Sequence, residues 1–148
     1  MNSNAARAAT LVRALHAAIE GDSSVVGQLF TDDVKVWGPA MSAASSGELA
    51  TEFERRDDAF SDIELEVAPL DVSGDFACAE WWVTMTHSGH LVLADGVTIE
   101  PTGVSIRLNG AAVAEFQGER ICSLRQYWDE LAVLEQLGVL SEEPAQDA

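Results

Sequence analysis

Basic residues are scarce in this chain of 148 residues. Lys and Arg together number 8 against 25 Asp and Glu, which gives a formal net charge of −17 at pH 7. A charge of that size repels the phosphate backbone of nucleic acids and the anionic headgroups of lipids. We therefore expect neither a nucleic acid nor a membrane surface as a partner.

Cysteine is also rare. Cys78 and Cys122 are the only two, and each lies inside an apolar run with the spacing of a strand. Neither has a histidine close by in the sequence, so the pattern favours two reduced, buried thiols over a disulfide or a zinc site. We expect no metal site.

Long apolar runs are missing as well. No stretch approaches the roughly 20 apolar residues that cross a bilayer, and residues 1–10 lack the basic-then-apolar order of a signal peptide. The expected location is the cytoplasm. What the chain does have is 47% hydrophobic residues, enough for one core, and no repeat or linker. We expect a single domain over residues 1–140, followed by an acidic tail over 141–148.

Helical spacing dominates the first part of the chain. Leu11, Leu15 and Ile19 recur on one face of a predicted helix over residues 5–20, and Gly21 ends it. A short second helix is expected to reach residue 30. A third is expected over residues 47–60, with Ser45 or Ser46 as its N-cap.

The spacing changes to that of strands for most of the remaining chain. Alternation predicts strands at 33–37, 63–67, 76–87, 97–116 with breaks, and 120–128, before a last helix that ends at Leu137. Helices set against a mostly antiparallel sheet make an α+β fold. We expect the sheet to curve around the N-terminal helices as a cone and to enclose a pocket, a common form of small-molecule site.

Most candidate site residues come from two strands. Trp81, Met85 and His87 share the parity of one strand, so His87 continues an apolar face to its rim. The other candidates, Arg125, Tyr127 and Asp129, share the parity of the last strand. We expect Asp129 and His87 to form an acid/base pair near neutral pH. The expected substrate-binding residues are Trp37, Trp81, Met85, Arg125 and Tyr127.

Each of these residues also has a purely structural interpretation. Asp129 stands where a strand becomes a helix and is equally well suited to be an N-cap. Histidine at the end of an apolar strand is commonly a hydrogen-bonded boundary residue. The face that carries Tyr127 is either the pocket or a dimer contact, and Arg125 is either in the pocket or paired with a strand carboxylate. Trp81 and Trp82 point to opposite sides, and their spacing does not assign them.

Several motifs resemble those of one family. The run R-x-Y-W-D at 125–129 is followed by L-x-Q-L-G at 134–138, and T-M-T-H-S-G at 84–89 and P-T-G at 101–103 accompany it. These resemble the signatures of the SnoaL-like polyketide cyclases, in the nuclear-transport-factor-two-like superfamily. The resemblance implies a cone-shaped α+β fold and chemistry on an enolisable carbonyl compound without a metal or organic cofactor.

The chain departs from two other activities of that superfamily. Ketosteroid isomerases have a carboxylate base and an oxyanion-hole tyrosine. The corresponding positions in this chain look like Gly38 and Ala14. Limonene epoxide hydrolases need an Arg and an Asp where this chain has Trp81 and Val83. Both mechanisms therefore lack their acting groups.

Two hypotheses follow for the function. The first is a cofactor-independent cyclase, isomerase or hydrolase that acts on a small apolar carbonyl compound. The second is a non-catalytic module of the same fold for ligand binding or dimerisation, because fold does not fix function. A homodimer is expected in either case, because one face of the sheet is left uncovered and apolar residues such as Trp82 could lie on it.

Overall fold

The computed structural model describes residues 3–39, 41–55, 59–93 and 96–139. The first helix, α1 (Ser3–Glu20), leads through a 3-10 turn, η1 (Ser23–Val25), into the short α2 (Val26–Leu29). Strand β1 (Phe30–Trp37) and the short β2 (Ser42–Ala43) precede α3 (Ser46–Glu54). The predicted acidic tail at 141–148 lies outside the described residues.

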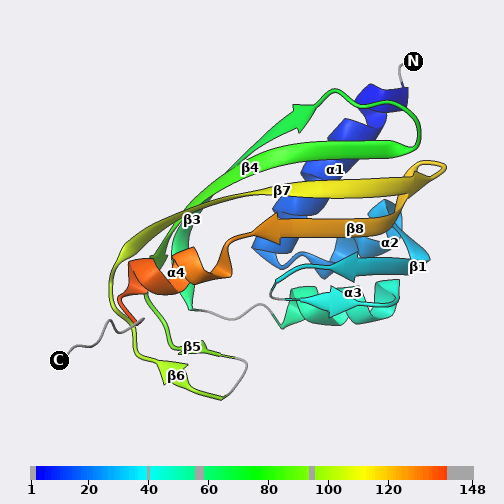
Figure 1. Cartoon of the computed structure of the whole chain (residues 1–148). Coiled ribbons are helices and arrows are strands. Elements are labelled where there is room, and N and C mark those ends of the chain that lie inside the picture. Colours follow the sequence, from blue (N-terminus) through cyan, green and yellow to red (C-terminus); the bar gives the residue numbers. More distant parts are fainter. Residues whose placement is uncertain (1–2, 40, 56–58, 94–95, 140–148) are drawn as a thin grey trace.

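The second part of the chain is mostly sheet. It contains β3 (Phe60–Leu70), β4 (Phe76–His87), the short pair β5 (Leu91–Val92) and β6 (Thr98–Ile99), then β7 (Ser105–Gln117) and β8 (Arg120–Trp128). Helix α4 (Glu130–Leu137) follows β8 directly. In Figure 1 this helix lies beside the bent ends of the long strands.

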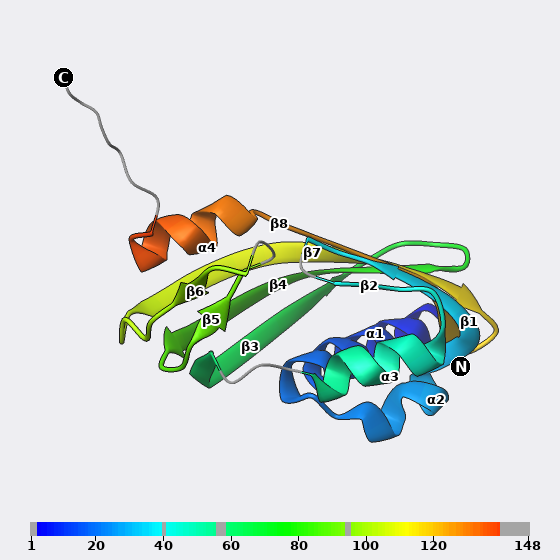
Figure 2. The same ribbon diagram turned by 90° about the horizontal axis from the view of Figure 1, so that it is seen from below.

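Six strands form one sheet in the order β2-β1-β8-β7-β4-β3. Only the β1–β8 pairing is parallel, so the sheet is mostly antiparallel as predicted. Helices α1, α2 and α3 lie on the same side of the sheet, which curves over them (Figure 2). The predicted α+β class and curved sheet are confirmed, but the sheet stays open, with β2 and β3 at its two ends.

Bulges contribute to the curvature. The register of β3 against β4 shifts between Ser61 and Glu64, where Asp62 has a φ of 52°. A second shift interrupts the β7–β8 pairing between Glu115 and Phe116. An extra residue on one strand bends that strand and increases its twist. The sheet therefore bends around the helical layer instead of lying flat.

We call the side of the sheet packed by helices its inner face. Small residues line the inner face of β4, on which α1 packs, and of the neighbouring β7, namely Ala77, Ala79, Ala112 and Ala114. They let the helix approach closely and bury Leu11 and Leu15. Because α1 ends at Glu20, the sheet beyond its last turn is left without this cover.

Most predicted elements are present, but several boundaries differ: β1 begins at Phe30 and not Asp33, and β3 covers Phe60–Leu70 and not 63–67. The spans 76–87 and 120–128 coincide with β4 and β8, and the predicted break divides 97–116 into β6 and β7. The third helix was expected to reach residue 60, but α3 ends at Glu54 and Phe60 begins β3. Ser45 is its N-cap and accepts a hydrogen bond from the Glu48 amide. Among the described residues, no helix has the length and apolar character needed to cross a bilayer.

A glycine occupies the most crowded point of the inner face. Gly110 pairs with Trp81 on β4 and with Trp128 on β8, so the three residues form one row across three strands. A Cβ at this position would lie 2.4 Å from Cζ2 of Trp81 and 2.4 Å from the Tyr127 carbonyl oxygen. The indole of Trp81 therefore occupies the space that any side chain at position 110 would need.

We predict that Gly110→Ala lowers the free energy of unfolding by about 1–3 kcal/mol, because the added methyl overpacks a well-filled site. Urea denaturation measures the change. Gly27→Ala in α2 is the matched control, since a Cβ there meets nothing within 4 Å, and it should be neutral or slightly stabilising. Equal stability of the two variants would contradict the crowding.

Candidate functional site

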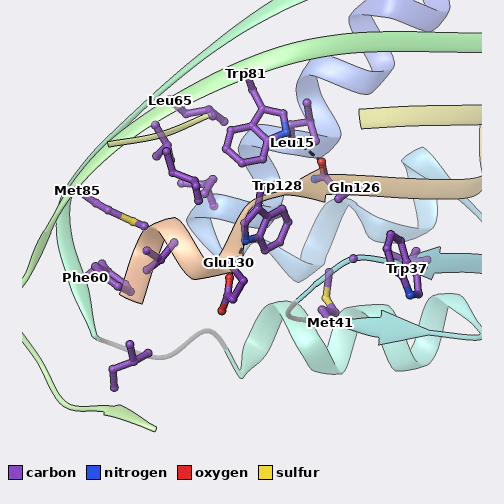
Figure 3. Close-up of a pocket in the computed structure, with 18 residues that line it drawn as sticks. Leu15, Trp37, Met41, Phe60, Leu65, Trp81, Met85, Gln126, Trp128 and Glu130 are labelled. Atoms are coloured by element: carbon purple, nitrogen blue, oxygen red, sulfur yellow. Dashed lines mark hydrogen bonds between the residues drawn. The ribbon is translucent and has the colours of Figure 1, made fainter. Parts of the chain in front are cut away.

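A cavity of about 320 Å³ opens on the inner face beyond the last turn of α1. Its walls come from α1, β1 and the segment after it, β3, β4, β5, β7, β8 and α4, and are almost entirely apolar. Figure 3 shows this lining, with Trp81, Leu65 and Leu15 on one side and Trp128, Met85 and Phe60 around the remainder. A concave apolar site with few polar groups is the usual form of a small-molecule pocket.

The two tryptophans of the Gly110 row form one wall. The rings of Trp81 and Trp128 meet edge to face, with centroids 5.8 Å apart and an interplanar angle of 68°. Aromatic pairs favour this arrangement because the positive ring edge meets the negative ring face. The pair therefore gives the cavity a rigid aromatic surface.

Each indole N–H holds one polar side chain of the lining. Trp81 Nε1 donates to Oε1 of Gln126 at 3.0 Å, and Trp128 Nε1 donates to Oε1 of Glu130 at 2.7 Å. Gln126 and Glu130 are both in the lining. Of the described residues around the cavity, Glu130 is the only one with a titratable side chain. A carboxylate fixed by an indole can accept a proton from a molecule in the cavity.

Three of the predicted substrate-binding residues do line this cavity. Trp81 and Met85 belong to its wall on β4. Trp37 also contributes, although it is 51% exposed and its ring, tilted by 54°, has its centroid 5.4 Å from that of Tyr127. It therefore lies at the rim.

The other two predicted binding residues lie on the opposite face of the sheet. Arg125 and Tyr127 share a face as expected, but Leu124, Gln126 and Trp128 have the inward parity on β8. The Arg125 guanidinium donates to Oγ of Ser123 at 3.4 Å, and Tyr127 is 46% exposed. We call this side, opposite the helices, the outer face. Of the two interpretations of the Tyr127 face, the one that placed it in the pocket does not agree with this cavity, whose lining includes neither Arg125 nor Tyr127.

His87 is fully buried but does not line the cavity. Its Nδ1 accepts a hydrogen bond from the Thr102 amide at 3.2 Å and lies 2.9 Å from Oγ1 of the same residue. Because Nδ1 is an acceptor, the neutral ring carries its proton on Nε2, which has no partner among the described residues. The Phe60 ring packs against the imidazole at 5.5 Å.

The contact of His87 links two sequence motifs. Thr102 belongs to the P-T-G turn, and the Gly103 amide of that turn donates to the His87 carbonyl at 2.8 Å. Gly103 has a φ of 73°, which favours glycine. Within the described chain, His87 thus fastens the end of β4 to the turn before β7.

Asp129 is the N-cap of α4. Its Oδ1 accepts from the Leu131 amide at 3.0 Å and from the Ala132 amide at 3.3 Å, and the residue is exposed. Neither Asp129 nor His87 contributes to the cavity wall. The structure therefore does not bring the predicted acid/base pair together in the cavity, and the carboxylate that does line it belongs to the next residue, Glu130.

Gln126 and Glu130 were not predicted. A signal for Gln126 exists in the sequence, since it shares the parity of the apolar Leu124 and Trp128. Glu130 carries no such signal, because an acidic residue in the first turn of a helix is ordinarily a partner of the helix dipole. Only the position of the Trp128 indole assigns it to the cavity.

In the described part of the chain, no three His, Cys, Asp or Glu side chains lie close enough together to hold a metal ion. Cys78 and Cys122 are free cysteines, as expected, but they are half-buried and not buried. Burial raises the pKa of the Cys122 thiol, and the negative charge of Glu115 raises it further.

Comparison with protein families gives a match over residues 11–124 to the SnoaL-like domain. The chain belongs to the SnoaL-like family. The comparison with curated proteins gave no match.

Solved structures of SnoaL-like and related proteins share the fold. AclR, a proposed hydroxylase from Streptomyces galilaeus, is 23% identical with a TM-score of 0.73, over 95% of this chain and 90% of that one. A proposed SnoaL-like polyketide cyclase from Jannaschia sp. CCS1 is 16% identical, with a TM-score of 0.77 over 95% and 97%. An LEH-like epoxide hydrolase from M. tuberculosis is 15% identical, with a TM-score of 0.67 over 92% of each chain. At these identities the likeness shows the fold alone.

In this SnoaL-like chain we predict that Asp129→Ala lowers the free energy of unfolding by about 1 kcal/mol, because two amides of α4 lose their acceptor. Asp129→Asn should stay close to wild type, since an asparagine oxygen caps equally well. Thermal or urea unfolding measures both. An Asn variant as unstable as the Ala variant would contradict a capping role.

Proposed function

We propose that this SnoaL-like protein binds a small, largely apolar carbonyl compound in the inner-face cavity and transfers a proton to or from it without a cofactor. Glu130 is the residue that moves the proton. The observation that carries this proposal is the Glu130 carboxylate, which the Trp128 indole holds at 2.7 Å in a wall whose other described side chains are apolar except for Gln126.

The chemistry follows from that placement. Loss of a proton next to a carbonyl gives an enolate, which leads to isomerisation or to ring closure by attack on a second carbonyl. A positioned carboxylate accelerates such proton transfer by about 10²–10⁴-fold. The apolar walls supply binding free energy of about 25 cal/mol for each Å² of apolar surface removed from water.

A panel of aromatic polyketide and steroid-like ketones tests this proposal. Wild-type protein should turn over at least one of them, and Glu130→Gln should reduce kcat by about 10²–10⁴-fold. Glutamine keeps an oxygen for the Trp128 indole, so the fold should be unaffected. The control is Asp129→Asn, which alters the adjacent carboxylate outside the cavity and should leave turnover unchanged. Full activity of the Glu130 variant would contradict the assignment.

A second candidate is non-catalytic binding of the same class of ligand. It is favoured by one observation, that the predicted pair of His87 and Asp129 does not line the cavity. Ketones that bind wild-type protein without turnover would support it over the enzyme.

We also propose that two copies of the chain associate through their outer faces. Large aromatic side chains are exposed there, with Trp82 at 43% and Tyr127 at 46%, beside the rim residue Trp37. The net charge of −17 means that acidic side chains are plentiful and can cover the solvent-exposed surface. Exposed aromatic side chains are the part of the surface whose burial in a contact is most favourable. An identical face on a second copy is a self-complementary partner.

Sedimentation of the wild-type protein at micromolar concentration should therefore give a dimer. Trp82→Glu should give a monomer, because it places a charge in the contact. Val92→Glu is the control, since Val92 is 62% exposed but lies on β5, outside the six-stranded sheet, and it should remain dimeric. A monomeric wild type would contradict the proposed contact.

A further inference from the structure

The orientation of the Gln126 amide is fixed by its neighbour. An indole N–H is a donor only, so the atom it meets at 3.0 Å must be the amide oxygen of Gln126. Figure 3 shows this bond running from Trp81 to Gln126 at the edge of the cavity. The amide nitrogen therefore lies on the other side of a planar group whose oxygen is already engaged.

The two N–H donors of that nitrogen have no hydrogen-bond partner among the described residues. Few hydrogen-bond acceptors lie near them, because the other described side chains of the cavity wall are apolar apart from Glu130. Gly38 adds to the open space, since a Cβ there would come within 3.3 Å of the Gln126 Cβ. A donor that is left unpaired when a ligand displaces water costs about 1–3 kcal/mol. A ligand that fills the cavity well must therefore offer Gln126 an acceptor.

We infer that the Gln126 amide N–H is the specificity-determining group of the cavity and donates a hydrogen bond to a carbonyl oxygen of the bound molecule. This inference rests on the proposed function, that the cavity takes a small apolar molecule. A carbonyl suits the site because it accepts without bringing a donor of its own that would need a partner in the apolar walls. Aromatic or alicyclic ketones are the chemical class that fits.

The same bond has a consequence for reactivity. If a proton is removed next to the carbonyl, negative charge develops on its oxygen, and a donor already aimed at that oxygen stabilises it. Gln126 would thus hold the carbonyl in place while Glu130 acts on the neighbouring carbon. Gln126 acts only as a hydrogen-bond donor and does not transfer a proton.

Two probes of nearly the same shape test the inference. 2-Acetylnaphthalene has a ketone oxygen, and 2-isopropylnaphthalene has a methyl group in its place. Equilibrium dialysis of both compounds together gives the ratio of their affinities for each protein variant. Using the change in this ratio between variants removes the difference in hydrophobicity between the probes.

Gln126→Met should lower the ketone-to-hydrocarbon affinity ratio about tenfold relative to wild type, as expected for one lost hydrogen bond. Gln126→Glu should lower it at least as far, since it keeps an oxygen for the Trp81 indole but replaces both donors with an acceptor. The control is Gln117→Met, the same substitution at an exposed position at the end of β7, and it should leave the ratio unchanged.

The possible results separate the two levels of the proposal. Binding of both probes with a ratio that neither Gln126 variant changes would overturn the inference and leave the proposed function standing. Binding of neither probe by wild type would overturn both. Should the variants fail to fold, the infrared carbonyl stretch of the ketone bound to wild type decides. A stretch at lower frequency than in hexane supports the hydrogen bond, and a stretch at the hexane value overturns it.

Discussion

The row formed by Trp81, Gly110 and Trp128 is the contact on which the site depends. A glycine in the middle strand leaves room for an indole from the strand on one side, and that indole meets the indole from the other side at 5.8 Å. The row closes one wall of the cavity. It also directs both indole N–H groups, one to Gln126 and one to Glu130, so a packing contact positions both polar side chains found among the described lining residues.

The cavity itself follows from a mismatch between helix and sheet. Alanines on β4 and β7 bring α1 close to one half of the inner face, whereas large aromatic side chains occupy the half beyond the end of α1. Two helices border the remaining space. Leu15 and Ile19 approach from the last turns of α1, and Val133 approaches from α4, which packs on Ile106 of β7. This arrangement leaves a hollow between the two helices and the sheet.

The sequence predicted the fold more closely than the site, for physical reasons. Alternation with a period of two is a strong signal, and it placed β4 and β8 at their observed ends. Parity also grouped Arg125 with Tyr127 correctly, but parity alone does not say which group faces inward. The apolar Leu124 and Trp128 have the opposite parity and decide the question, since burial favours the apolar set. The polar residues Arg125 and Tyr127 therefore lie on the outer face.

Local signals were also ambiguous at the ends of elements. Asp129 was equally suited to a pocket and to an N-cap, and the structure shows it capping α4. Glu130 lies in the cavity lining because of the Trp128 indole, a contact between neighbours that no periodicity encodes. The third helix ended six residues early because Phe60 is needed on β3, where it packs beside His87.

The four tryptophans of the chain offer the most direct test of the central claim, that the aromatic hollow on the inner face is where a ligand binds. Fluorine NMR of protein labelled with 5-fluorotryptophan, assigned by single Trp→Phe variants, would be recorded during titration with an aromatic ketone. The account predicts that the Trp81 and Trp128 signals shift together and that Trp82, on the outer face, does not. Movement of Trp82 alone, with Trp81 and Trp128 unchanged, would contradict it.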